Sequence, residues 1–152
     1  MDDETLVRLF EAGEVPPGGF HHRDHVRVAW WYLRRDSVAG ALARFTDRLQ
    51  HFARAQGKPH LFHATITTAY MLVIHDRLIA TPPDAEWDEF AARHSDLLTW
   101  RPSVLDRYYT PATLDSERAR LAFVMPDRVG QRLPASIDRT ATTRPIAGRC
   151  SC

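Results

Sequence analysis

Residues 20–33 read Phe-His-His-Arg-Asp-His-Val-Arg-Val-Ala-Trp-Trp-Tyr-Leu, so three histidines fall within five residues and an apolar run follows them. Within the run, Val26, Ala29, Trp30 and Leu33 recur at the spacing of one helical face. The aromatic rings make this helix apolar on several sides, which is typical of a helix with neighbours all around it. The stretch therefore predicts a central helix whose first turn carries the histidines.

Apolar periodicity along the rest of the chain predicts an all-α, compact single-domain helical bundle. We expect five main helices, between Asp2 and Gly13, over residues 21–35, between residues 36 and 56, and over residues 60–80 and 82–98, followed by short helices over residues 103–109 and 114–124. The β-branched run at residues 65–68 is compatible with a strand, but the length and period around it favour a helix. The helical domain is predicted to cover residues 1–133. Residues 134–152 contain no aromatic side chain and are expected to form a flexible tail.

Charge and composition argue against several classes of protein. The chain has 152 residues and a net charge of +1, which does not indicate a surface for nucleic acid or anionic lipid. No apolar run reaches the about 18 residues of a membrane span, and the acidic start lacks the features of a secretion signal. We therefore expect a cytoplasmic protein that acts on a small molecule and binds neither nucleic acid nor membranes. Its oligomeric state is left open between a monomer and a homodimer.

A second histidine pair, His60 and His63, opens the next strongly apolar segment. Residues three or four apart share one face of a helix, so His22 and His25 are expected to point to one place, with His63 facing them from the neighbouring helix. Three imidazoles are a usual ligand set for a first-row metal that keeps one position open. The sequence thus predicts a single zinc, iron, copper, nickel or manganese ion held by these three residues. His21 is a substitute ligand or a supporting group, as is His60.

Three polar side chains are candidates for a catalytic role beside the histidines. Thr67 lies one turn beyond His63, where its hydroxyl would orient a ligand, although a helical threonine often binds the preceding turn instead. Tyr32 and Tyr70 lie further along the same two helices and would line a pocket or donate a phenolic proton. Such tyrosines are more often core residues with a satisfied hydroxyl.

The histidine cluster supports more than one kind of function. The first hypothesis is a metal-dependent enzyme in which the ion activates water, oxygen or a substrate carbonyl. A second is a metal-independent enzyme that uses the histidines as acid and base for a dehydration, isomerisation or cyclisation. A third is a metal- or ligand-binding sensor or accessory protein without turnover, in which Cys150 and Cys152 take part. Structural roles for the histidines, as helix caps or hydrogen-bonded core residues, remain open beside all three.

Three phrases of the sequence carry a resemblance. They are His22-x-x-His25-Val-x-x-Ala29-Trp-x-Tyr32-Leu33, then His63-x-Thr65-Ile66-Thr67, and a late phrase with Tyr109, Leu114-x-Ser116, Ala119-Arg120, Phe123-Val124 and Pro126-Asp127. Together they resemble an uncharacterised family of small bacterial all-helical proteins, over about residues 20–134. The resemblance implies that His22, His25, His63, Thr65 and Thr67 matter more than His21 or His60, and it assigns no reaction. Relatives can carry an acidic residue where this chain has Ala64.

Overall fold

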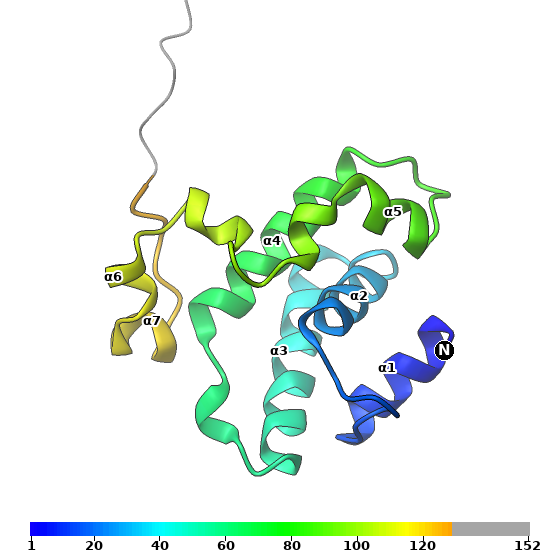
Figure 1. Ribbon diagram of the computed structural model, residues 1–152, viewed down its shortest axis with the longest axis horizontal. Helices are drawn as coiled ribbons and strands as arrows, with labels where there is room; N and C mark the ends of the chain where they lie inside the picture. Colours follow the sequence, from blue (N-terminus) through cyan, green and yellow to red (C-terminus); the bar gives the residue numbers. More distant parts are fainter. Residues whose placement is uncertain (129–152) are drawn as a thin grey trace, which may run out of the picture.

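The computed structural model describes residues 1–128, and the fold there is all-α, as the sequence predicts (Figure 1). The described residues form seven α-helices, three short 3-10 helices and no strand. The α-helices are α1 (Asp3–Ala12), α2 (His22–Leu33), α3 (Val38–Ala55), α4 (Ala64–Ile79), α5 (Trp87–Arg93), α6 (Pro111–Leu114) and α7 (Glu117–Leu121). The 3-10 helices are η1 (Pro59–Leu61), η2 (Ser95–Leu98) and η3 (Val104–Arg107). No described helix is long and apolar enough to cross a membrane.

Local sequence signals fix the ends of the first helices. The Asp2 carboxylate accepts the Thr5 backbone N–H at 2.7 Å and caps α1, and Gly13 ends that helix with φ at +74°. A β-carbon at Gly13 would also lie 2.7 Å from the Ala55 side chain, so glycine is required for backbone and packing reasons alike. Ser37 caps α3 through a hydrogen bond from the Gly40 backbone N–H at 3.1 Å.

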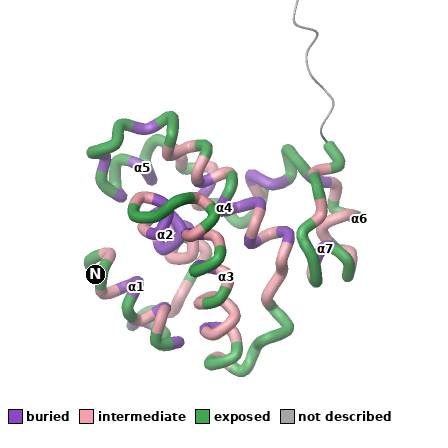
Figure 2. The backbone as a smooth tube through the Cα atoms, turned by 180° about the vertical axis from the view of Figure 1, so that it is seen from behind, coloured by how far each residue is buried: buried purple, intermediate pink, exposed green. Residues whose placement is uncertain are grey.

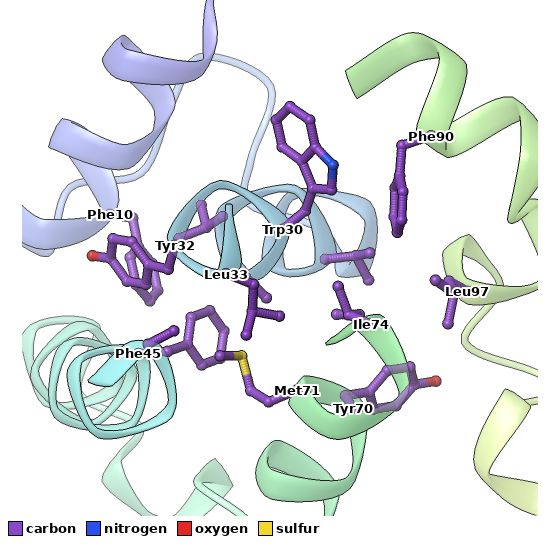
Figure 3. Close-up of a cluster of buried hydrophobic side chains, with 14 of the residues drawn as sticks. Phe10, Trp30, Tyr32, Leu33, Phe45, Tyr70, Met71, Ile74, Phe90 and Leu97 are labelled. Carbon is purple, nitrogen blue, oxygen red and sulfur yellow. The ribbon is translucent and has the colours of Figure 1, made fainter. Parts of the chain in front are cut away.

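Helix α2 is the centre of the bundle, because it packs against α1, α3 and α4 (Figure 2). Its side chains enter the core on several sides: Tyr32 faces the α1 and α3 side, and Trp30 meets Trp87 and Phe90 near α5 (Figure 3). The prediction that this helix is central is therefore confirmed. The segment that carries α6 and α7 packs on α4, at the side of the molecule away from α1 (Figure 1).

Two predicted helices are shorter than expected. The predicted helix over residues 60–80 begins at Ala64, because Lys58 precedes a proline and His63 is extended, with φ −135° and ψ 107°. The predicted helix over residues 82–98 is reduced to α5 and η2, because the backbone leaves the helical region at His94. The ring of that histidine lies 2.8 Å from the Thr81 hydroxyl.

The late chain is less helical than predicted. In place of two helices over residues 103–109 and 114–124, it has η3, α6 and α7, and the chain is extended again from Ala122. Pro111 begins α6 instead of separating two helices, since proline fits the first turn, where its missing N–H is not needed. The predicted tail over residues 134–152 and the domain limit at residue 133 lie outside the described residues.

Candidate functional site

A cavity of about 780 Å³ lies between α2, α3 and α4, which is a common size for a site that binds a small molecule. The loop after α1, the connection between α3 and α4, and Trp100 complete its wall. Most of the lining is apolar, but the polar residues are not spread evenly over it. They come from the first turns of α2 and α4 and from the chain after α3: His22, His25, Gln56, Lys58, His63, Thr67 and Tyr70.

The opposite end of the cavity is apolar. There the lining consists of Phe45 from α3, Ala29 from α2, and Met71 and Ile74 from α4, all of them buried (Figure 3). The exposed lining residues mark the mouth, and they are Val15, Lys58, Leu61 and Trp100. The cavity therefore runs from a mouth at which Lys58 is the one charged side chain to an apolar interior.

His25 lies in the cavity wall without a hydrogen-bond partner for its ring among residues 1–128. The ring is held by its edge against Phe20, with the two centroids 4.6 Å apart, and against Phe10. The pKa of His25 is lowered from 6.5 to about 4, mainly by desolvation and in addition by the charge of His22, while Asp24 opposes the shift. At neutral pH this side chain is an uncharged imidazole whose hydrogen-bonding groups are available to a bound molecule.

His22 lies one turn earlier on the same helix and is fixed in position. Its Nε2–H donates to the backbone carbonyl of Leu97 at 2.9 Å, since a carbonyl can only accept. The ring also packs against Tyr70 and Trp100, with centroids 5.1 and 5.3 Å away. Desolvation lowers the pKa of His22, and the bond to Leu97 works in the opposite direction. His22 is therefore a neutral ring with Nδ1 as its remaining acceptor.

His63 touches the cavity, but both of its ring nitrogens are engaged. Nδ1 accepts the Ile66 backbone N–H at 3.2 Å and so caps α4, which leaves the proton on Nε2. Nε2–H then donates to the backbone carbonyl of Leu114 at 2.8 Å. This histidine joins the start of α4 to α6 and has no lone pair left for a metal or a substrate.

The predicted metal site does not fit this arrangement. Among residues 1–128, no three histidine, cysteine, aspartate or glutamate side chains are grouped so that they could hold a metal ion. His22 and His25 do lie together as predicted, but the third expected ligand, His63, is used as a cap. The substitute ligands do not help, because neither His21 nor His60 lines the cavity. The prediction placed His63 inside a helix, whereas it precedes the first helical residue of α4.

Thr67 and Tyr70 lie where the sequence predicts, in the cavity wall beside the histidines. The Thr67 side chain is only 7% exposed, and its hydroxyl makes no hydrogen bond to any residue that the structure describes, including the preceding turn of α4. The Tyr70 hydroxyl lies 2.8 Å from the hydroxyl of Ser103, and burial raises the pKa of the phenol. Of the two, Thr67 has a hydroxyl that is free of any partner in the described chain, whereas the Tyr70 hydroxyl is engaged with Ser103.

Tyr32 does not line the cavity. It lies on the side of α2 that carries it next to Phe10 (Figure 3). Its hydroxyl donates to the Glu11 carboxylate at 2.5 Å, and Arg44 donates to the same oxygen at 2.6 Å. Burial, followed by this hydrogen bond, raises the pKa of Tyr32. The residue connects α1, α2 and α3, so the structure separates it from the predicted site.

Thr65 has a structural position, although it belongs to the same phrase as His63. Its hydroxyl is fully buried, donates to the carbonyl of Ala122 at 2.9 Å and accepts the Val124 backbone N–H at 3.1 Å. Tyr109 also donates to the carbonyl of Val124, at 2.9 Å. Two of the three phrases, the second and the late one, thus meet in space and hold the end of the described chain against α4.

Among the residues of the cavity wall that sequence reasoning missed are Gln56, Lys58 and Trp100. Gln56 donates from its side chain to the carbonyl of Gly13 at 2.7 Å and so ties the loop after α1 to the end of α3. Lys58 is the single lysine of the chain, and this was the signal available in the sequence. Trp100 gave none, because its contact with the histidines depends on the path of the chain after η2.

Comparisons of the chain with protein-family models, with curated proteins and with solved structures give no significant match. The family resemblance therefore stays a prediction, and the residues that line the cavity are the basis for proposing a function.

Proposed function

We propose that the chain binds a mostly apolar small molecule in the cavity between α2, α3 and α4 and catalyses a proton transfer on it without a metal. The observation that carries this proposal is the neutral, unpaired imidazole of His25 in the cavity wall. A neutral imidazole is the usual general base of proteins, and it returns the proton as a general acid. Isomerisation, dehydration and cyclisation are the reaction classes that need only such a step.

Each polar residue of the wall has a part in this proposal. His25 accepts a proton from the bound molecule and returns it to another atom, so no electrons are gained or lost. The Thr67 hydroxyl donates a hydrogen bond to the atom on which negative charge develops, which stabilises the transition state. His22, anchored on the carbonyl of Leu97, and Tyr70 orient the molecule. The low pKa of His25 keeps the ring in the neutral form that can accept a proton at pH 7.

Hydrogen exchange into a bound compound tests the proposal. Compounds that displace a neutral apolar fluorophore from the full chain would be incubated with it in D₂O and followed by NMR. We expect the wild type to exchange a carbon-bound proton of at least one such compound. His25→Gln should bind that compound but exchange it about 100-fold or more slowly, the size of a typical general-base contribution.

His75→Gln is the matched control, because His75 lies on α4 but does not line the cavity. This variant should exchange the compound at the wild-type rate. Equal rates for His25→Gln and the wild type would contradict the role of His25, and binding without any exchange would reduce the proposal to a ligand-binding protein.

A further inference from the structure

The cavity has an unbalanced charge. Its lining contains one cation, Lys58, and no aspartate, glutamate or arginine. No carboxylate of residues 1–128 forms an ion pair with the Lys58 ammonium group. A lysine at the mouth of an otherwise neutral cavity attracts an anion, because nothing else in the lining offsets its charge.

Hydrogen-bonding groups at the same end of the cavity favour an anion as well. The Thr67 residue is only 7% exposed, and its hydroxyl, near the start of α4, has no partner within the described chain. His25 lies near the start of α2. Both helices therefore direct the positive ends of their dipoles to this end of the cavity. The C-terminal end of α3, which carries the negative end of the dipole of that helix, also lies here. At this end the backbone N–H of Lys58 donates to the carbonyl of Ala53 at 2.8 Å and so satisfies one of the terminal carbonyl groups of α3.

The opposite end accepts only an apolar group, because Phe45, Met71 and Ile74 line it without a polar side chain. We propose that the ligand is a carboxylic acid with an apolar body, whose carboxylate lies beside Lys58 and whose body fills the interior between α2, α3 and α4. A carboxylate fits better than a phosphate, since one lysine balances one negative charge and the second charge of a phosphate has no partner. This inference rests on the cavity being the site of the proposed function.

Matched pairs of probes test the charge separately from the cavity. Decanoate and 1-decanol share one shape of body, and 4-phenylbutyrate and 4-phenylbutanol share another. Binding to the full chain at pH 7.5 would be measured by titration calorimetry and by the intrinsic tryptophan fluorescence, to which Trp100 of the cavity wall contributes. We expect the acid of at least one pair to bind about three- to tenfold more tightly than its alcohol, the range for a partly exposed ion pair.

Variants locate the charge that causes this preference. Lys58→Gln should remove the preference for the acid and leave the affinity for the alcohol unchanged. Lys58→Arg, which retains the positive charge, should keep the preference for the acid. Arg54→Gln is the matched control, because it removes the same charge from an exposed residue near the end of α3 that does not line the cavity. It should retain the wild-type preference.

The outcomes separate the two proposals. Equal affinity of acid and alcohol in the wild type overturns the carboxylate but leaves the proton-transfer proposal standing. The same loss of preference in Arg54→Gln and Lys58→Gln also overturns it, because the effect would then come from net charge. If none of the four probes binds, the cavity is not a site for apolar ligands, and the proposed function fails with it.

Discussion

At the scale of single residues, His25 shows how the environment of a side chain decides what it does. His25 and His63 have the same side chain but different surroundings. The His25 ring lies against phenylalanine rings and has no hydrogen-bond partner in the described chain, whereas both ring nitrogens of His63 form hydrogen bonds. Burial of an ionisable group disfavours its charged form, so His25 is kept neutral by the energy of desolvation. The same feature that leaves its ring available to a ligand also makes the fold sensitive to pH.

Replacement of His25 by phenylalanine should therefore flatten the pH dependence of stability. The folded pKa of about 4 lies below the unfolded value of 6.5, so the unfolded chain binds more protons between these values and stability falls as the pH falls through that window. This linkage amounts to about 2 kcal/mol between pH 7 and pH 5. Urea unfolding of both proteins at the two pH values measures it. An equal loss of stability in the variant would show that His25 titrates normally in the fold.

At the scale of elements, the start of α4 has a structural role and its middle part lines the cavity. Its start is fastened by His63 and Thr65 to the chain around α6 and α7, and its middle supplies Thr67, Tyr70 and Met71 to the cavity. The late segment is further tied by Asp127, which accepts hydrogen bonds from Thr110 and Thr113 and has its pKa lowered to about 2 by these bonds. The late segment therefore braces the cavity wall from outside.

Thr65→Val should loosen this brace, because valine keeps the shape of threonine but leaves the carbonyl of Ala122 and the N–H of Val124 unpaired. A buried polar group without a partner costs about 1–3 kcal/mol. We expect a loss of stability in this range and faster amide exchange at Val124. Thr68→Val is the control, since its hydroxyl has no hydrogen-bond partner within residues 1–128, and it should change stability by less than about 0.5 kcal/mol. Similar losses in both variants would argue against the brace.

The difference between local features and contacts between distant residues explains how much of the fold and of the site could be predicted from the sequence. Helix-ending glycine and apolar spacing are local signals, so the end of the first helix at Gly13 and the central place of α2 were predicted correctly. A capping role for the histidines was left open, but the bond from His63 to Leu114 was not predicted, because the two residues are 51 positions apart in the sequence. His22, His25, Thr67 and Tyr70 were found because helical spacing brings them to one side. Lys58 lies outside any helix, where no periodicity places it.

At the scale of the whole molecule, the cavity combines an apolar interior with groups whose charge depends on what is bound. In the free protein His25 is neutral, and Lys58 is the one cation of the lining. A carboxylate bound at the mouth would bring a negative charge toward His25 and favour its protonated form. The protonated fraction of His25 takes its proton from the solvent and can act as an acid, and the neutral fraction remains the form that accepts a proton from the ligand.

Binding of 4-phenylbutyrate should therefore be accompanied by proton uptake. At pH 6 the free carboxylate is ionised and His25, with a pKa of about 4, is neutral, so any rise in this pKa on binding takes a proton from the buffer. Calorimetry in phosphate and in imidazole buffer, which differ in their heat of ionisation, measures this number. We expect between zero and one proton for the wild type, and a smaller number for His25→Phe. 4-Phenylbutanol is the control and should bind without uptake, because it brings no charge. Heats of acid binding that do not depend on the buffer would mean that His25 stays neutral beside the carboxylate, and the coupling between ligand charge and the histidine would then be excluded.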